Sequence, residues 1–181
     1  MRPPVTPTAP VRSIRSSSHP PQTMNIALLN QLTAFVWAEA DLLDHAEYAA
    51  WLDLWSPTGT YIVPIDPETT DFDNTLNYAH DNAAMRSARV ARLTSGESVS
   101  TQPMARTVRN VSRLRVLSDD GSTVTLRGVQ DLHEFRKTHR HQYTADVTWT
   151  LVRNGEGWRI ERKVLRLINS TDALAGIGFI L

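Results

Sequence analysis

The stretch YTADVTWTLVR, residues 143–153, alternates apolar and polar side chains along most of its length. The apolar positions are Tyr143, Ala145, Val147, Trp149 and Leu151. The positions between them carry threonine or aspartate. Because successive side chains of a strand point to opposite faces, this period of two predicts a β-strand with one buried and one exposed face.

Three stretches with the same period flank it, at residues 107–117, 123–137 and 158–168. Two of the connections carry strong turn signals, DDG at 119–121 and NGEG at 154–157. Glycine beside aspartate or asparagine supplies the positive backbone angles that tight hairpins require. The second half of the chain is therefore predicted to form four antiparallel strands joined in chain order.

The first half of the chain has a helical period instead. From Asn25 onward, apolar side chains fall on one stripe of a helix, at successive spacings of four, three, one, six and one. They are Leu28, Leu32, Phe35, Val36, Leu42 and Leu43. Glu39 lies on the same stripe, where an isolated charge would cost several kcal/mol. We expect Glu39 either to act as a catalytic acid or base in a pocket or, as the favoured interpretation, to pair with a buried arginine.

Shorter elements are predicted between this helix and the strands. Asp44 followed by Glu47 resembles a capping box, which would start a second helix near His45. The segment TYIVPI at 60–65 is typical of a strand, and its proline indicates an edge or a bulge. A third helix is expected over residues 82–93, with Gly96 just beyond its end.

Helices followed by an antiparallel meander predict an α+β fold in which a curved sheet wraps the N-terminal helices. One domain is expected over residues 24–181. Residues 1–23 hold six of the ten prolines and no apolar run, so they are expected to form a disordered tail or to reflect a start codon assigned too early. They can neither span a membrane nor serve as a signal peptide.

Composition excludes several function classes. The 19 basic residues balance 19 acidic ones, and residues from Met24 onward carry 16 against 19, which argues against nucleic acid as a partner. The chain has no cysteine. It therefore cannot hold an iron–sulfur cluster, form a disulfide or use a thiolate nucleophile.

Three blocks of sequence carry a family resemblance. They are EADLLDHAEYAAWLDLWSPTGTYIVP at 39–64, RVARLTSGESVSTQPMARTVRNVSRLRV at 89–116, and DVTWTLVRNGEGWRIERKVLRLIN at 146–169. In this order they resemble the small, or beta, subunit of aromatic-ring-hydroxylating dioxygenases, which are Rieske non-haem iron enzymes.

The resemblance implies a cystatin-like cone, the fold shared by nuclear transport factors, ketosteroid isomerases and scytalone dehydratases. It also implies a cytoplasmic, structural subunit with no catalytic, cofactor-binding or metal-binding residue of its own. The Rieske iron–sulfur cluster and the mononuclear non-haem iron would belong to a catalytic alpha subunit. The expected assembly is an α3β3 hexamer that contains a beta trimer.

Within the matched blocks, charged residues are candidates for ion pairs inside the domain or across a subunit boundary. They are Arg89, Arg92, Arg106, Arg109 and Glu39. The closing segment TDALAGIGFIL, residues 171–181, is strongly apolar. We expect it to be covered, most plausibly by a neighbouring subunit.

Two other function classes stay open from the sequence. A stand-alone dehydratase or isomerase would use Asp41 or Asp44 with His45 or His80, helped by Tyr61, as an acid–base pair inside the cone. A free-standing small-molecule binding module would also fit the fold.

The histidines of the second half of the chain raise the alternative of a metal site. His133, His139 and His141 lie near Asp131 and Glu134, a combination compatible with two-histidine, one-carboxylate iron ligation. A turn expected at 138–140 separates these histidines, so surface histidines are the favoured interpretation.

Overall fold

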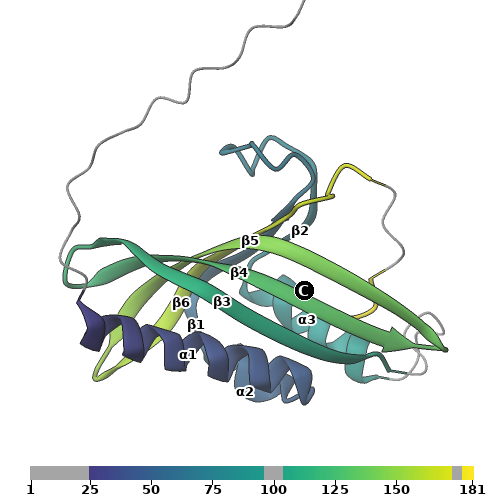
Figure 1. The fold of residues 1–181 in the computed structure, drawn as a ribbon, viewed down its shortest axis with the longest axis horizontal. Helices are drawn as coiled ribbons and strands as arrows, with labels where there is room; N and C mark the ends of the chain where they lie inside the picture. Colours follow the sequence, from purple (N-terminus) through teal and green to yellow (C-terminus); the bar gives the residue numbers. More distant parts are fainter. Residues whose placement is uncertain (1–24, 96–103, 173–176) are drawn as a thin grey trace, which may run out of the picture.

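The protein is described by a computed structural model over residues 25–95, 104–172 and 177–181. Three helices and six strands follow one another within these described residues (Figure 1). In order they are α1 (Ile26–Asp44), α2 (Tyr48–Asp53), β1 (Trp55–Pro64), β2 (Asn77–Asp81), α3 (Ala83–Thr94), β3 (Arg106–Asp119), β4 (Thr123–Arg136), β5 (His139–Asn154) and β6 (Gly157–Leu167). The predicted tail at 1–23 and Gly96 lie outside the described residues.

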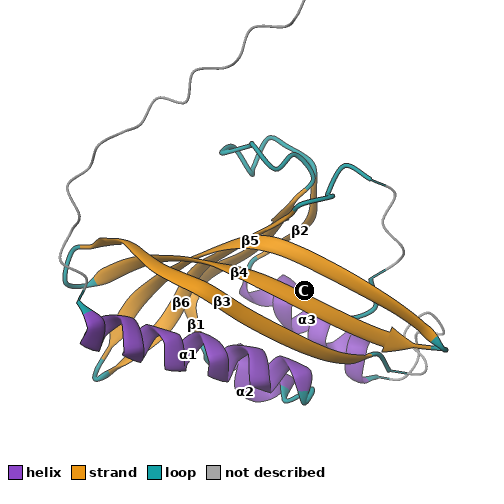
Figure 2. Ribbon diagram, viewed as in Figure 1, coloured by secondary structure: helices purple, strands orange, loops and turns teal. Residues whose placement is uncertain are grey.

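The strands form one curved sheet in the order β2-β1-β6-β5-β4-β3. The hairpins β3–β4, β4–β5 and β5–β6 confirm the predicted antiparallel meander. β1 adds to β6 in parallel, and β2 then pairs with β1 antiparallel, so the sheet is mixed. Figure 2 shows the helices gathered on one side of this sheet. The expected α+β cone, with helices packed in a curved, mainly antiparallel sheet, is confirmed.

The helix stripe read from the sequence is the face that α1 buries. Leu28, Leu32, Val36, Glu39 and Leu43 are all buried. The side chain of Asn25 accepts a hydrogen bond from the Leu28 amide and so caps the first turn. By length and composition α1 could also cross a membrane, but its apolar stripe packs on the sheet as in the core helix of a globular domain.

Two local predictions were wrong in detail. Asp44 does not cap a second helix: it is the last residue of α1, and α2 begins after Glu47 without a side-chain cap. β5 begins at His139, four residues before the predicted strand, because Lys137 and Thr138 both adopt positive φ and close a tight two-residue turn. The proline of the 60–65 segment does mark a bulge, since the β1–β2 register shifts between Val63 and Pro64.

The core lies between the helices and the concave face of the sheet. Its largest fully buried aromatic side chains are Trp51, Trp149 and Tyr61. The end of the chain also enters this core, where Phe179, Ile180 and Leu181 are buried. The expected cover by a neighbouring subunit is therefore wrong for these three residues, which the chain covers itself.

Candidate functional site

The centre of the cone, where the acid–base alternative requires a pocket, holds a buried ion pair. The Lys163 Nζ donates to Glu39 Oε1 at 2.8 Å, and both side chains are almost completely buried. Glu39 also accepts hydrogen bonds from the indole N–H groups of Trp149, at 2.9 Å, and Trp51, at 3.3 Å. The carboxylate thus has three donors.

Burial and pairing act on Lys163 in opposite directions. Burial lowers the pKa of Lys163, and the adjacent Glu39 carboxylate opposes that shift. The Lys163 ammonium group and the two indoles occupy three of the roughly four acceptor sites of the Glu39 carboxylate, which is held in place by them. The basic partner is a lysine 124 residues away rather than the arginine expected from the sequence.

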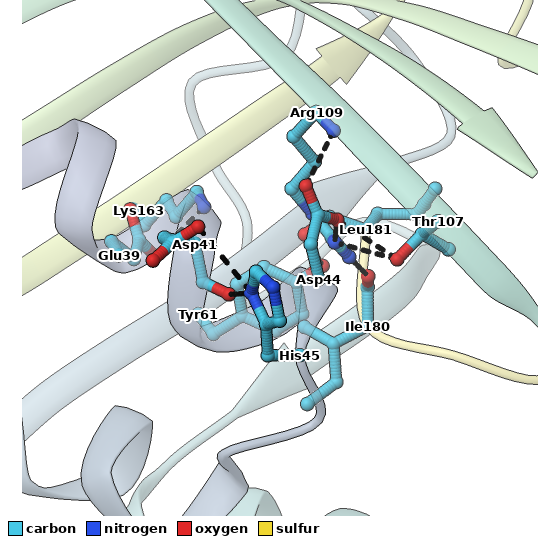
Figure 3. A network of polar contacts seen from close by, with 10 residues as sticks. All are labelled: Glu39, Asp41, Asp44, His45, Tyr61, Thr107, Arg109, Lys163, Ile180 and Leu181. Atoms are coloured by element: carbon cyan, nitrogen blue, oxygen red, sulfur yellow. Dashed lines mark hydrogen bonds and ion pairs between the residues drawn. The ribbon is translucent and has the colours of Figure 1, made fainter.

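A second polar network closes the wide end of the interior (Figure 3). Arg109 reaches from β3 to Asp44 at the end of α1, forming an ion pair in which the Asp44 carboxylate also accepts from the Arg109 amide at 2.7 Å. The other end of the guanidinium donates to the carbonyl of Ile180. Thr107 completes the group through its hydroxyl, 2.9 Å from Asp44 Oδ1.

Tyr61 is bound by the same closing segment. Its hydroxyl donates to the backbone carbonyl of Leu181 at 3.1 Å. Burial raises the pKa of Tyr61 far above its usual value of 10. The hydroxyl is therefore a neutral donor with a protein partner. Together with the Arg109 network, it ties residues 177–181 into the cone.

The other candidate arginines lie further out. Arg89 on α3 forms a two-pronged ion pair with Asp81, with Nη2 3.0 Å from Oδ1. Arg106 is exposed and stacks over the Phe135 ring. Arg92 is exposed in the last turn of α3. A role in subunit contacts for these residues stays a prediction.

Asp44 and His45 both line one open cavity, but Asp44 is already paired with Arg109, and the candidate acid–base residues do not converge on Tyr61. His45 and Asp41 face each other at 3.3 Å on the surface, with side chains 64% and 77% exposed. His80 lies 3.6 Å from the exposed Asp73, on β2 at the opposite edge of the sheet. Tyr61 is enclosed in the core between them. No pair from this set shares a cavity with Tyr61 in the part of the chain that the structure describes.

The histidines near the β4–β5 turn also separate. His141 Nδ1 lies 3.0 Å from Glu134 Oε2 on one face of the hairpin. His133 sits one register step away, so its side chain is on the opposite face. His139 contacts the carbonyl of Lys137. Among the described residues, no group of three potential ligands is close enough to hold a metal ion.

One open cavity of about 830 Å³ lies at the wide end of the cone. Its floor includes the buried rings of Tyr48 and Phe179, and its rim carries Arg106, Arg140 and His141. The inserted end of the chain contributes Phe179 to this lining. Neither Glu39 nor Lys163 lines the cavity.

The sequence of this chain matches a known protein family. The model of the ring hydroxylating beta subunit family matches residues 38–172. The chain belongs to this family. It is 27% identical over 147 residues to the benzoate 1,2-dioxygenase subunit beta of Acinetobacter baylyi, covering 78% of this chain and 86% of that protein.

Solved structures agree on the fold of this ring-hydroxylating beta subunit. The crystal structure of the beta subunit of benzoate 1,2-dioxygenase from Burkholderia mallei superposes with a TM-score of 0.69 at 24% identity, covering 88% of this chain and 99% of that one. An NTF2-like protein with a cystatin-like fold from Novosphingobium aromaticivorans gives a TM-score of 0.55 at 18% identity, covering 80% and 86%. The family and fold expected from the sequence blocks are confirmed.

Sequence reasoning missed three participants in the interior of the subunit. The alternation along the predicted strand placed Lys163 on the polar face with Arg159 and Glu161. A register shift between β5 and β6, at Ile160 to Arg162, turns Lys163 inward instead. Asp44 was assigned to a helix cap instead of to Arg109. The closing segment was recognised as apolar, but nothing in its sequence shows that it folds back into its own chain.

Proposed function

We propose that this beta subunit is a non-catalytic, cytoplasmic component of an aromatic-ring-hydroxylating dioxygenase that positions catalytic alpha subunits in an α3β3 hexamer. The observation that carries the proposal is the filled interior. Where an isomerase or dehydratase of this fold would need a pocket lined by an acid and a base, this chain has the Glu39–Lys163 pair, two indoles and residues 179–181.

The redox groups of such an enzyme would be a Rieske iron–sulfur cluster and a mononuclear non-haem iron, both in the alpha subunit. The residues of this chain do not fit the cluster, since Rieske ligation needs two cysteines and the sequence has none. This chain would then contribute geometry: it would hold the alpha subunits around a beta trimer so that hydroxylation of the aromatic ring takes place in the partner.

Coexpression with a catalytic alpha subunit from the same organism tests the proposal. Native mass spectrometry of the purified complex should give equal numbers of the two chains with a total mass of three pairs. Ring hydroxylation should require both chains and the electron donor. A complex that lacks this chain but hydroxylates at the full rate, or turnover of an aromatic substrate by this chain alone, would contradict it.

A matched pair of variants separates assembly from acid–base catalysis. If the chain were an isomerase or dehydratase, Asp41→Asn and His80→Gln should abolish its turnover. If it is an assembly subunit, both variants should leave the hydroxylation rate of the complex unchanged, because both side chains lie on the surface away from the core.

A further inference from the structure

A second cleft lies outside the core, between α2, α3 and the start of β1. It has a volume of about 510 Å³. Apolar atoms of Leu52, Trp55 and Pro57 form one side, and Arg86 and Arg159 are the charged residues of its lining. We refer to it as the Arg86 cleft.

Arg86 is an unusual buried cation. Only 2% of it is exposed, and its guanidinium stacks on the Trp55 ring at 4.1 Å from the ring centre. Its Nη1 donates to two backbone carbonyls, those of Gly59 and Asp81. The carboxylate of Asp81 is held by Arg89. In the described parts of the chain, no carboxylate forms an ion pair with Arg86.

Two buried donors at the cleft have no acceptor among the described residues. They are the Arg86 Nε–H and the Trp55 indole N–H. Buried polar groups without a partner are uncommon in native proteins, because each loses its hydrogen bonds to water without replacement. Burial also lowers the pKa of Arg86, and the Asp81 and Glu161 carboxylates oppose that shift.

The other groups at the cleft favour the same sign of ligand. Arg159 donates to the carbonyls of Asp53 and Trp55 and forms no ion pair within the described residues. Ala83, the first residue of α3, borders the cleft, and the first turn of that helix carries no acidic residue. A helix N-terminus bears partial positive charge. The nearest acid on β6, Glu161, is already hydrogen-bonded to Ser56 and Thr58.

We propose that the Arg86 cleft binds a carboxylate group, with Arg159 as the direct ligand and Arg86 as the buried charge beneath it. A planar carboxylate matches a guanidinium through paired hydrogen bonds. The apolar side of the cleft would accept the carbon part of the ligand. The carboxylate has two possible sources: a small organic acid, or an acidic side chain of a neighbouring subunit.

Titration of the isolated chain tests the first source. Sodium acetate and sodium benzoate are the probes, with sodium chloride at equal ionic strength as the reference. The indole N–H resonance of Trp55, assigned with Trp55→Phe, should shift saturably in ¹⁵N-correlated NMR spectra. Arg159→Gln should weaken this binding at least tenfold. Arg153→Gln is the matched control, because Arg153 also stacks on an indole and donates to a backbone carbonyl, but outside the cleft.

The second source is tested by assembly with the alpha subunit, and this arm rests on the proposed function. If small carboxylates give no saturable shift, Arg159→Gln but not Arg153→Gln should weaken assembly at least tenfold, and rising salt should reduce the difference. Arg86→Met removes the buried charge beneath the ligand and should weaken assembly as well. If the Arg86→Met protein does not fold, Arg159→Gln alone still tests the site.

The two proposals fail in different ways. Two results would overturn the carboxylate site. In the first, no probe gives a saturable shift and Arg159→Gln assembles like the wild type. In the second, no probe binds and the wild type does not assemble with the alpha subunit at all. Failure of wild-type assembly together with carboxylate binding contradicts only the proposed function.

Discussion

Lys163 in the interior of the cone and Arg86 on α3 are both basic side chains of which 2% or less is exposed. Lys163 faces a carboxylate that is itself hydrogen-bonded by two indoles. Arg86 faces two backbone carbonyls and an aromatic ring, and its Nε–H has no acceptor among the described residues. Burial alone therefore does not distinguish a structural charge from one available to a ligand. The partners differ instead: Lys163 faces a carboxylate, whereas Arg86 faces backbone carbonyls and a ring.

The largest effect is expected from unpairing the interior charge. Lys163→Met leaves Glu39 buried without its counter-ion, which should lower the free energy of unfolding by about 3 to 5 kcal/mol. The double variant Glu39→Gln with Lys163→Met removes both charges and keeps an acceptor for the two indoles, so it should lose less than the single variant. Urea unfolding followed by tryptophan fluorescence measures both.

Arg127→Gln is the matched surface control for this comparison. Arg127 pairs with Asp146 on the sheet, but its side chain is 55% exposed, so its loss should cost about 0.5 kcal/mol. If Lys163→Met costs no more than Arg127→Gln, the interior pair is not the fixed structural charge inferred here.

A smaller effect is expected from the segment that closes the interior. Phe179→Ala removes a buried ring that packs edge-on against Tyr143, with centroids 5.7 Å apart. The loss of buried area and the cavity left behind should cost about 3 kcal/mol. Hydrogen exchange should also quicken at the backbone amides of the closing segment.

Ile177→Ala provides the comparison, since Ile177 belongs to the same segment but is only partly buried. Equal costs for the two variants would show that Phe179 does not anchor the segment in the core.

The sequence predicted most of the frame that holds both regions. The alternation of apolar and polar residues predicted β3 to β6, and the helical period of apolar residues predicted the buried face of α1. Both patterns arise because one side of each element is buried. β2 was missed, since a strand of five residues at the edge is decided by its pairing with β1 and has too few residues to show a period.

The sequence did not predict which polar side chains would pair, either inside the cone or at the Arg86 cleft. Glu39 and Lys163 are 124 positions apart, and Arg109 and Ile180 are 71 apart. Such contacts depend on the way the sheet curls over the helices, which local patterns do not encode. Glu39 was recognisable as buried from its stripe, but its partner was not. Arg86 gave no signal, because a helical arginine near the start of α3 resembles a solvated one.

The smallest effect concerns an exposed charge at the mouth of the cone. The pKa of His45 is raised above 6.5, first because its Nδ1 lies 2.8 Å from the backbone carbonyl of Asp41 and second because of the Asp41 carboxylate. A raised folded-state pKa means that protonated His45 stabilises the fold below about pH 6.5 and that this contribution disappears as pH rises through the folded-state value. The His45 side chain is exposed to solvent, so the effect on the free energy of unfolding should be slight.

Proton NMR titration of the His45 ring measures its pKa in the folded protein directly. Asp41→Asn removes the carboxylate but keeps the backbone acceptor, so the pKa should fall part of the way toward 6.5 and not reach it. A complete return to 6.5 would show that the carboxylate, not the carbonyl, causes the shift. An unchanged value would show that the surface ion pair contributes nothing, in contrast to the interior pair, where the Glu39 carboxylate opposes the lowering of the Lys163 pKa by burial.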